Sequence, residues 1–488
     1  MASEGASTVE LDPNLVSSDF LRLVSRDFAR EHLVLSQGRA GGVERLATAR
    51  STPSAVVFNV GVHLGIPVEA READGEAIAR IVDEVYAKHA EERKFEAVLE
   101  IDGEEELARL LSEVDRDLLS TQGKGPVVKF VDSVLFEALG RDASDVHVQP
   151  LSDKALVRCR VDGALHTVRE IPKGLATALV SRIKVMGGMD IAERRVAQDG
   201  RATVKIGERP IDLRISTFPT NYGERAVLRL LDNTRRLYDF EALGMPADLA
   251  QSYLECANRS NGILLVTGPT GSGKTTTLYS TLRRTASSDL NVMTIEDPIE
   301  YDLSLVGLTV SQAQVNSKKG VTFATGLRHI LRQDPDVILV GEIRDADTAR
   351  IAIQSSLTGH QVFSTLHTND APSAVTRLMD LGVEPYLVSA SINAVLAQRL
   401  VRLIHQGCQG KGCETCFGTG LLGRTGLFEL MVLDEEIRAL ISQRANLATI
   451  RDAARARGMR SLREEGEALV KAGRTTVAEV DRIVQRAS

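Results

Sequence analysis

Residues 268–275 of the chain read Gly-Pro-Thr-Gly-Ser-Gly-Lys-Thr. Because the glycines carry no Cβ, their backbone N–H groups can form a concave ring of donors, and their φ angles can be positive. Phosphate oxygens fit such a ring, the lysine adds a charge for the β and γ phosphates, and the threonine hydroxyl can reach Mg²⁺. The run therefore predicts a site for a nucleoside triphosphate, with Thr275 as the Mg²⁺ ligand. The predicted binding residues are Gly268, Pro269, Thr270, Gly271, Ser272, Gly273, Lys274, Thr275 and Thr276.

The sequence on either side of this run has the context that a phosphate-binding loop needs. Residues 263–267 are a short apolar run typical of a buried strand, and residues 275–283 have a composition compatible with a helix. The positive N-terminal end of that helix would then face the phosphates. The alternative interpretation is a glycine-rich surface turn, which does not require a strand before it and a helix after it.

Strand and helix signals alternate from Gly262 onward. The candidate strands are nearly continuous apolar runs, as is typical of strands buried on both faces of a parallel sheet. They lie at residues 263–267, 292–296, 337–340 and 362–366. We therefore predict a doubly wound α/β core. Upstream, an Asp162-Gly163 turn and a second hairpin that pairs 202–206 with 211–217 predict a small α+β domain.

Length and charge limit the kinds of protein that this chain can be. Its 488 residues are enough for about three domains. The formal net charge of −7 argues against a nucleic-acid motor, whose binding channel is usually basic, so we expect no nucleic-acid partner. No apolar stretch is long enough to cross a bilayer, and Met1–Glu10 lacks the pattern of a signal peptide. We expect a cytoplasmic protein whose contact with a membrane is through a partner.

Two carboxylates follow predicted strands. Hydrolysis of a nucleotide needs a water that is held in line and relieved of its proton, and a carboxylate at the end of a strand beside the loop can do both. Glu342 follows the run 337–340, with Gly341 between them, and Glu296 ends the run 292–296. We predict that Glu342 activates the water and that Glu296 assists. The alternative is that both are solvated charges at strand ends.

Three motifs surround these strands. They are Glu-Asp-Pro-Ile-Glu at 296–300, Val-Gly-Glu-Ile-Arg-Asp at 340–345 and Thr-Gly-His-Gln-Val-Phe-Ser-Thr-Leu-His-Thr-Asn-Asp at 358–370. They resemble, in this order, the aspartate box, Walker B motif and histidine box of the ATPases of type II secretion and type IV pilus systems. Further segments extend the resemblance, at 143–147, 192–201, 212–217 and 223–225. The resemblance implies a hexameric, membrane-associated ATPase that binds ATP and Mg²⁺, with a PAS-like domain ahead of a RecA-like core.

The resemblance also implies a role for arginines of the PAS-like domain. Such arginines can close over the γ-phosphate in their own or in a neighbouring subunit. Alternation in residues 211–215 places Arg214 on the polar face of a strand, and Arg225 and Arg229 share a face of the next one. We predict catalytic roles for Arg214 and Arg229, and next for Arg225. A solvated basic face or structural ion pairs are the alternative.

Two histidines, His360 and His367, stand on either side of the predicted strand at 362–366. The resemblance suggests that they belong to the nucleotide site and couple the state of the γ-phosphate to the sheet. The alternative for each is a histidine whose hydrogen bonds are satisfied within the protein core.

Three of the five cysteines lie close together, at Cys408, Cys413 and Cys416, shortly after His405. Three thiolates and one imidazole satisfy tetrahedral Zn²⁺, and the two short spacings can form a compact knuckle. The family that the chain resembles usually has two Cys-x-x-Cys pairs, and His405 stands where the first of those cysteines would be. We predict a zinc site, and the alternative is a degenerate loop that has lost its metal. The cysteines do not suggest a disulfide framework.

The run 230–233 and the segment Phe28–His32 favour the secretion branch of this family. That branch implies a cytoplasmic hexameric ATPase, peripheral to the inner membrane, that drives pseudopilus assembly and protein export. Its partners would be further copies of the chain and inner-membrane platform proteins, one of which docks on the N-terminal domain. The alternatives are a type IV pilus assembly ATPase, a DNA-translocating ATPase, and a nucleotide-gated scaffold with little turnover.

These predictions divide the chain into five segments, and the fold class that follows is α/β. The segments are an N-terminal α/β partner-docking domain and linker (1–118), a PAS-like α+β domain (119–240), a RecA-like doubly wound ATPase core (241–400), a compact Cys/His metal loop (401–426) and a C-terminal helical segment (427–488).

Overall fold

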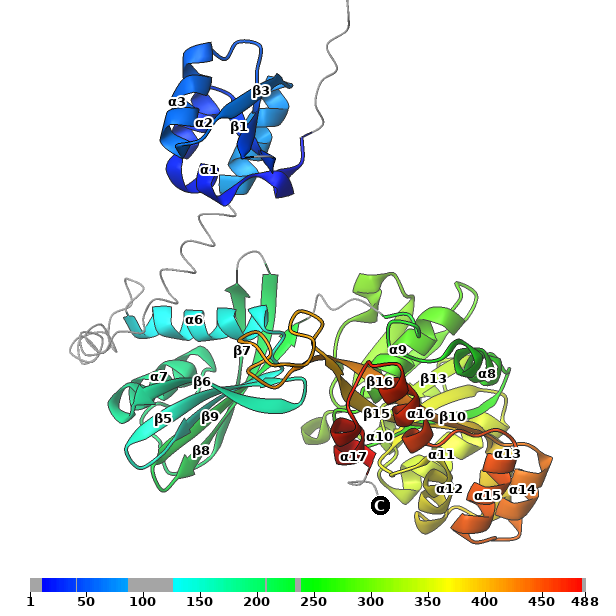
Figure 1. Ribbon diagram of the computed structural model, residues 1–488. Coiled ribbons are helices and arrows are strands. Elements are labelled where there is room, and N and C mark those ends of the chain that lie inside the picture. Colours follow the sequence, from blue (N-terminus) through cyan, green and yellow to red (C-terminus); the bar gives the residue numbers. More distant parts are fainter. Residues whose placement is uncertain (1–10, 41, 87–125, 207–208, 233–237, 485–488) are drawn as a thin grey trace, which may run out of the picture. The chain divides into compact units, whose positions relative to one another are not determined.

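The computed structural model describes residues 11–40, 42–86, 126–206, 209–232 and 238–484 (Figure 1). By its internal contacts the chain divides into two compact units, Met1–Val134 and Leu135–Ser488. The predicted domain boundary at residue 118 lies outside the described residues.

The first unit is a small α/β fold built around a three-stranded sheet in the order β1-β2-β3. β1 pairs antiparallel with β2, whereas β2 and β3 are parallel and are joined through helix α3. Its elements are the short turn η1 (Pro13–Leu15), α1 (Ser18–Leu23), α2 (Arg26–Glu31), β1 (Val34–Ala40), β2 (Val43–Thr48), α3 (Ser54–Leu64), β3 (Val68–Glu72) and a further helix at 75–86.

Serine residues start the first two helices of this unit. The side-chain oxygen of Ser17 accepts the backbone N–H of Phe20, and that of Ser25 accepts the backbone N–H of Phe28. These bonds satisfy donors that would otherwise be unpaired in the first turn of each helix. The caps thereby fix α1 so that Phe20 is buried in the apolar core of the unit together with Ile78 from the last helix.

The second unit begins with a domain of six strands, which we call the accessory domain (residues 135–232). Its strands form one antiparallel sheet in the order β6-β5-β4-β9-β8-β7. Helix α7 (Lys173–Met186) packs on this sheet, and helix α6 (Pro126–Gly140) spans the division between the two units. The strands are β4 (Asp145–Pro150), β5 (Lys154–Val161), β6 (Ala164–Pro172), β7 (Gln198–Ile206), β8 (Arg209–Thr220) and β9 (Gly223–Asp232).

Alternation along the strands gives this sheet one apolar and one polar face. In β5, Val157 and Cys159 are buried, whereas Arg158 between them points to the other face and is only partly buried. The predicted turn at Asp162 and Gly163 joins β5 to β6, and both residues have positive φ. A two-residue hairpin loop of this kind matches the twist of the strands on either side of it. The domain agrees with the α+β fold that the hairpin signals predict.

The rest of the second unit, which we call the core domain (residues 238–484), contains a seven-stranded sheet in the order β12-β11-β13-β14-β10-β15-β16. The first six strands in this order are parallel, and β16 runs antiparallel at the edge. The strands are β10 (Gly262–Thr267), β11 (Val292–Glu296), β12 (Val310–Gln314), β13 (Val337–Val340), β14 (Gln361–Leu366), β15 (Ile392–Ile404) and β16 (Leu421–Val432). The four predicted strands are thus found in one sheet.

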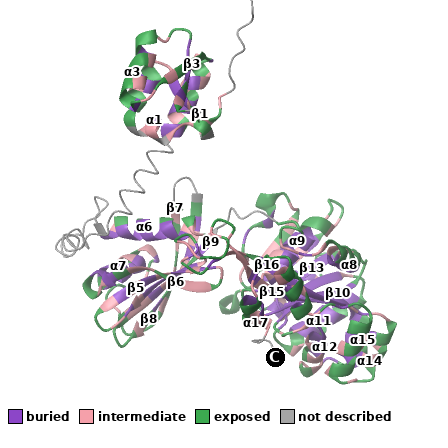
Figure 2. Ribbon diagram, viewed as in Figure 1, coloured by how far each residue is buried: buried purple, intermediate pink, exposed green. Residues whose placement is uncertain are grey.

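Apolar residues cover both faces of this sheet. Along β10, Ile263 and Leu265 belong to one buried cluster, and Leu264 and Val266 belong to another. Because successive side chains of a strand point to opposite faces, the two clusters lie on opposite sides of the sheet. Figure 2 shows β10 and β13 buried along their length. The predicted doubly wound fold class is confirmed.

Helices and short turns precede, connect and follow these strands. They are α8 (Ala247–Ala257), α9 (Lys274–Thr285), η2 (Leu303–Val306), η3 (Ser317–Lys319), α10 (Phe323–Ile330), α11 (Ala346–Leu357), α12 (Ala371–Asp380), α13 (Pro385–Ser391), α14 (Glu435–Ser442), α15 (Leu447–Ala456), α16 (Leu462–Lys471) and α17 (Val477–Val484). Within the described parts of the chain, no helix is both long enough and apolar enough to span a membrane.

The sheet corrects two boundaries that the sequence suggests, at residues 400 and 426. Both fall inside strands, because β15 continues to Ile404 and β16 begins at Leu421. The two strands pair from Ala394 opposite Val432 to the far end of β15, so they form one extended edge of the core sheet. Burial of their apolar residues against the core stabilises this edge. The predicted metal loop is therefore only the connection between two strands of the core domain.

Candidate active site

The candidate residues meet because parallel strands end at the same edge of the core sheet. The glycine run follows β10, Glu296 is the last residue of β11, Glu342 stands two residues after β13, and His367 directly follows β14. In a parallel sheet these carboxyl ends lie on one side, where ligands of α/β proteins usually bind. The order of the strands places β13 and β14 between β11 and β10.

The loop after β10 is tightly packed against its neighbour β15. Gly268 has a φ of 152°, and a Cβ at this position would lie 2.5 Å from the carbonyl oxygen of Gln398. No other residue type fits so close an approach without displacing the backbone. Helix α9 begins immediately after the loop, with Gly273 as its N-cap. The loop therefore presents its backbone N–H groups at a helix N-terminus, as phosphate binding requires.

Lys274 is buried at the start of α9, and its Nζ donates to the carbonyl oxygens of Gly268 and Pro269 at 2.8 and 3.0 Å. Burial lowers the pKa of this lysine to about 8, although the nearby carboxylate of Glu342 opposes the shift. The ammonium group is thus held beneath the loop, within reach of a phosphate that the loop would bind.

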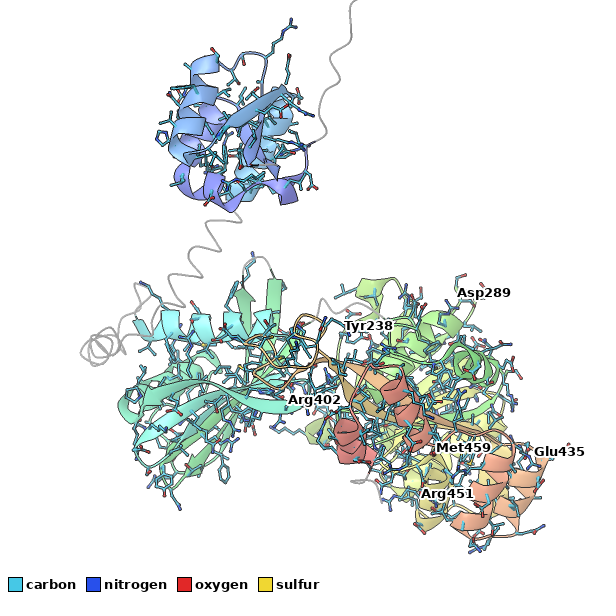
Figure 3. The ribbon with its side chains drawn as sticks, in the orientation of Figure 1. Tyr238, Asp289, Arg402, Glu435, Arg451 and Met459 are labelled. Carbon is cyan, nitrogen blue, oxygen red and sulfur yellow. The ribbon has the colours of Figure 1, made fainter. Side chains whose placement is uncertain are left out.

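A cavity of about 580 Å³ lies over the loop and the strand ends. Its lining includes Lys274, Glu296, Glu342 and also Arg229, which comes from β9 of the accessory domain. Tyr238, labelled in Figure 3, lines it as well. This volume falls in the range of small-molecule sites. The cavity therefore brings the phosphate loop, both predicted carboxylates and one predicted arginine together.

Glu342 is nearly buried and is held by two side chains. Its Oε1 lies 2.5 Å from a guanidinium nitrogen of Arg344, and its Oε2 lies 3.3 Å from Nε2 of His367. Burial, reinforced by the charge of Lys274, lowers the pKa of His367, so a neutral ring faces the carboxylate. Glu342 is consequently fixed in the lining of the cavity, in a position suited to a general base.

Glu296 is buried more deeply and accepts three hydrogen bonds. The donors are the hydroxyl of Thr294 at 2.7 Å, Nε2 of Gln312 at 3.1 Å and the hydroxyl of Tyr279. Burial raises the pKa of this carboxyl, and the three hydrogen bonds oppose the shift. Because its oxygens already have donors, Glu296 is better placed to orient other groups than to take a proton from water.

The predicted arginines lie on the polar face of the accessory sheet. Arg229 is directly opposite Arg214 on one side and Asp145 on the other, and its Nε donates to Asp145 at 3.1 Å. Arg225 donates to Nδ1 of His147 at 3.0 Å. Of the three arginines, Arg229 lines the cavity over the loop, whereas Arg214 lines a neighbouring hollow together with it. Arg229 therefore both pairs with Asp145 and lines the candidate site.

The structure separates the two predicted histidines. His367 reaches the cavity, but His360 precedes β14 at the opposite edge of the sheet, where its Nδ1 lies 2.8 Å from the carbonyl oxygen of Ser355. A six-residue strand spans about 20 Å. This position corrects the prediction that His360 belongs to the nucleotide site, because residues at the two ends of one buried strand cannot share a ligand.

Sequence reasoning missed two residues of β15 that support the loop from behind. Oε1 of Gln398 accepts a hydrogen bond from the hydroxyl of Thr277 in α9 at 2.8 Å. Arg399 is almost fully buried and donates to the carbonyl oxygen of Asn369 at 2.8 Å. The polar pair Gln398 and Arg399 interrupts an otherwise apolar run from Leu396 to Val401, and this is the signal that could have identified the strand as part of the site.

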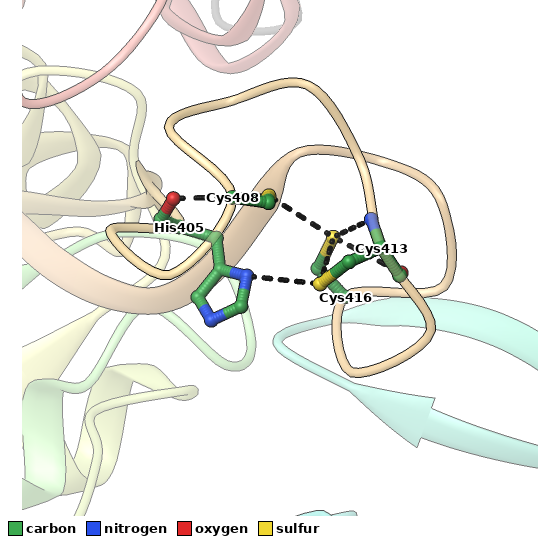
Figure 4. A group of neighbouring side chains, drawn as sticks. All are labelled: His405, Cys408, Cys413 and Cys416. Atoms are coloured by element: carbon green, nitrogen blue, oxygen red, sulfur yellow. Dashed lines mark hydrogen bonds between the residues drawn. The ribbon is translucent and has the colours of Figure 1, made fainter.

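The cysteines and His405 form a compact cluster between β15 and β16, shown in Figure 4. The Sγ atom of Cys416 lies 3.8 Å from that of Cys408 and 3.7 Å from that of Cys413, and Nδ1 of His405 lies 3.3 Å from Sγ of Cys413. Tetrahedral zinc with thiolate bonds of about 2.3 Å separates its sulfur ligands by about 3.8 Å. The backbone N–H groups of Cys413 and Gly420 also point at the sulfur of Cys416. These four residues fit a zinc ion.

The pKa of Lys274 leads to a prediction about nucleotide affinity. Above pH 8 a growing fraction of this lysine loses its charge in the free protein, whereas bound phosphates hold the proton. The affinity for ADP, measured at equilibrium, is therefore expected to fall between about pH 7.5 and pH 9.5, by at most about tenfold per pH unit. The Lys274→Arg variant keeps its charge throughout and should show a flatter curve. Equal slopes for both proteins would contradict the prediction.

The fold and the site together define a class of protein. The core domain has the parts of a P-loop nucleoside triphosphatase. An inner strand of a parallel sheet runs into a glycine loop, a buried lysine starts the next helix, and carboxylates stand at the ends of other strands. The arrangement of the core domain is the RecA-like form of that class.

Comparisons with known proteins extend this assignment. The family model for type II/IV secretion system proteins matches residues 120–482. The type II secretion system protein HxcR of Pseudomonas aeruginosa is 50% identical over 396 residues, which cover 79% of this chain and 84% of that protein. The type II secretion system protein E of Dickeya dadantii is 41% identical over 515 residues, covering 99% of this chain and 100% of that protein. The chain belongs to the type II/IV secretion system protein family.

Two solved structures agree with the fold. The pilus retraction motor PilT, solved with bound ADP, is 28% identical and covers 73% of this chain and 96% of that chain, with a TM-score of 0.53. The ATPase DotB of Legionella pneumophila is 23% identical, and the match covers 72% of this chain and 94% of that chain with a TM-score of 0.58. At this identity the match shows the fold alone. The predicted resemblance, the RecA-like fold class and the enzyme class, an ATP hydrolase, are confirmed.

Proposed function

We propose that this chain binds and hydrolyses ATP to drive protein export by a type II secretion system. One observation carries the catalytic part of this proposal: Lys274, Glu342 and Arg229 line a single cavity above the glycine loop. A phosphate chain on that loop would have the lysine beneath it and a carboxylate at its end. Full-length similarity to a type II secretion protein E supports the biological role.

In this proposal the residues of the cavity divide the work of hydrolysis. Backbone groups from Gly268 to Thr276 and the charge of Lys274 hold the phosphates, and Glu342 positions a water and accepts its proton. Glu296 orients the groups around it through its own hydrogen bonds. Thr275, which lines the cavity, would hold Mg²⁺, which would supply positive charge against the phosphates.

The accessory domain would sense the γ-phosphate through its arginines. Arg229 lines the cavity, and Arg214 stands beside it in the sheet register. Loss of the γ-phosphate would release these side chains, so that the accessory domain rotates against the core domain. In a ring of six copies such rotations would move an inner-membrane platform protein and drive pseudopilus assembly. The N-terminal unit would dock on a second platform protein and hold the ring at the cytoplasmic face of the inner membrane.

We predict that Arg229→Ala lowers the turnover number by a factor on the order of 10³, the size expected for an arginine that contacts the γ-phosphate. Equilibrium binding of ADP should change little, because ADP has no γ-phosphate. Arg195→Ala is the matched control, since Arg195 is an exposed arginine of the same domain that is paired with Glu193. If Arg229→Ala and Arg195→Ala both leave phosphate release unchanged, Arg229 serves only its ion pair with Asp145.

The choice between secretion and pilus assembly can be tested in the source organism. The type IV pilus assembly ATPase PilB of Thermus thermophilus is 42% identical over 85% of this chain, but the match covers only 48% of that protein. The secretion relatives match over most of their own length, which favours export. Deletion of the gene should abolish export of proteins to the medium and leave pili intact. Loss of pili with normal export would favour the pilus alternative instead.

We also propose that His405, Cys408, Cys413 and Cys416 hold a structural zinc ion that fixes the connection between β15 and β16. The purified protein should contain about one zinc per chain, and Cys413→Ser should lose it, because a closed structural site needs all four ligands. Cys256→Ser is the control, since this buried cysteine lies in α8 and outside the cluster. Metal analysis that finds well below one zinc per chain in the unmodified protein would reject the site.

A further inference from the structure

Arg344 forms an ion pair with Glu342, the proposed general base. It follows Glu342 by two residues in the segment after β13, and its guanidinium contacts Oε1 of that glutamate at 2.5 Å. The side chain of Arg344 is 63% exposed, whereas that of Glu342 is 11% exposed. Both residues line the cavity, together with Lys274 and His367. The arginine therefore covers the proposed base from the open side of the site.

This contact opposes the proposed function of Glu342. The guanidinium of Arg344 stands where a water would have to approach Oε1 of Glu342. The same guanidinium occupies the oxygen that would receive a proton from water. The other oxygen, Oε2, is buried and has no hydrogen-bond partner among the described residues, and Nε2 of His367 lies 3.3 Å from it. Hydrolysis through Glu342 requires that Arg344 first move away.

A γ-phosphate is the group that would move it. Arginine binds phosphate oxygens through charge-assisted, often bidentate hydrogen bonds, and a terminal phosphate carries more charge than a carboxylate. Arg344 is long and largely exposed, and it lines the cavity in which Lys274 would hold that phosphate. ADP has no γ-phosphate and would leave the contact with Glu342 in place.

We propose that Arg344 is a positioning residue that exchanges partners between Glu342 and the γ-phosphate. In one state it holds the glutamate inactive, and in the other it binds the phosphate and leaves the carboxylate free to act on water. This inference rests on the proposed function of the site. It adds that Glu342 can act as a base only when a triphosphate is bound, so it stays inactive when the site is empty or holds ADP.

A cycle of four proteins tests the exchange: the unmodified chain, Arg344→Gln, Glu342→Gln and the double variant. Equilibrium affinity is measured for ADP and for a non-hydrolysable ATP analogue, so that hydrolysis does not affect the result. Arg344→Gln should lower the affinity for the analogue by about tenfold, which is the effect of losing one charge-assisted hydrogen bond. The same substitution should change the affinity for ADP by less than about twofold. Glu342→Gln should raise the affinity for the analogue several-fold, because it frees Arg344 to bind the γ-phosphate. The double variant should not show that gain.

Two outcomes would overturn the exchange. Equal weakening of ADP and analogue in Arg344→Gln would show that this residue only supports the structure of the site. A gain from Glu342→Gln that persists without Arg344 would show that the glutamate acts on the phosphate by repulsion alone. Arg350→Gln is the matched control, because Arg350 is an exposed arginine of α11 that pairs with Asp347 at 3.5 Å, and it should change neither affinity.

Failure of the proposed function would look different from failure of the exchange. If the site is not a nucleotide site, the unmodified chain binds neither ADP nor the analogue. If only the exchange is wrong, both nucleotides bind and the selective effects of the two substitutions are missing. Arg344→Lys adds a further readout, since a lysine keeps the charge without the planar fork and should restore part of the analogue affinity.

Discussion

Replacement of Lys274 by alanine is expected to abolish nucleotide turnover. This lysine is the buried positive charge beneath the glycine loop, and it is held there by the carbonyl oxygens of Gly268 and Pro269. Its removal takes away the charge that would stabilise the β and γ phosphates, so phosphate release should fall by about 10²–10³ or more. Equilibrium affinity for ATP analogue and for ADP should fall together, since both carry a β-phosphate.

The control for this variant is Lys318→Ala, which removes an exposed lysine from the same core domain. It should leave both turnover and affinity unchanged. Thermal unfolding of Lys274→Ala separates loss of a charge from loss of the fold, because the buried lysine contributes no apolar core. Near-normal phosphate release by a folded Lys274→Ala protein would contradict the assignment of the site.

Replacement of Glu342 by glutamine is expected to stop hydrolysis while the protein still binds ATP. Glutamine has nearly the same size, but its neutral amide lacks the charge that holds Arg344, and it cannot take a proton from water. Loss of a general base typically lowers a rate by about 10²–10⁴. Single-turnover hydrolysis of ATP measures this effect directly, and equilibrium binding of ATP analogue shows that the site remains intact.

Glu296→Gln is the matched comparison, because Glu296 is the other buried carboxylate at the same edge of the sheet. Its oxygens accept hydrogen bonds from Thr294, Gln312 and Tyr279, so we expect a smaller loss of rate than for Glu342→Gln. The reverse order would exchange the proposed roles of the two glutamates. Phosphate release that is unchanged by Glu342→Gln in assembled rings would favour the scaffold with little turnover.

Much of the fold could be predicted because buried parallel strands are continuous apolar runs. The run at 337–340 became β13 residue for residue, and the run at 292–296 became β11. Carboxylates at or just after the ends of such runs lie at the carboxyl edge of a parallel sheet, which is why Glu342 and Glu296 are found in one cavity. Local pattern was sufficient for these elements.

Pairings between distant parts of the chain could not be predicted in this way. Gln398 accepts a hydrogen bond from Thr277, which is 121 positions earlier, and neither local sequence indicates this contact. β15 and β16 form one edge of the sheet, although the cysteine-rich connection between them resembles a separate segment. For His360 the local sequence misled the prediction. His360 and His367 belong to one motif, but they lie at opposite ends of β14.

Phosphate release from ATP by the purified chain, measured with magnesium over a range of protein concentrations, shows whether this cavity hydrolyses ATP. We expect magnesium-dependent turnover whose rate per subunit rises as the protein assembles, since arginines of one subunit can complete the site of another. Assembled protein that neither retains adenine nucleotide nor consumes ATP when magnesium is supplied would contradict it.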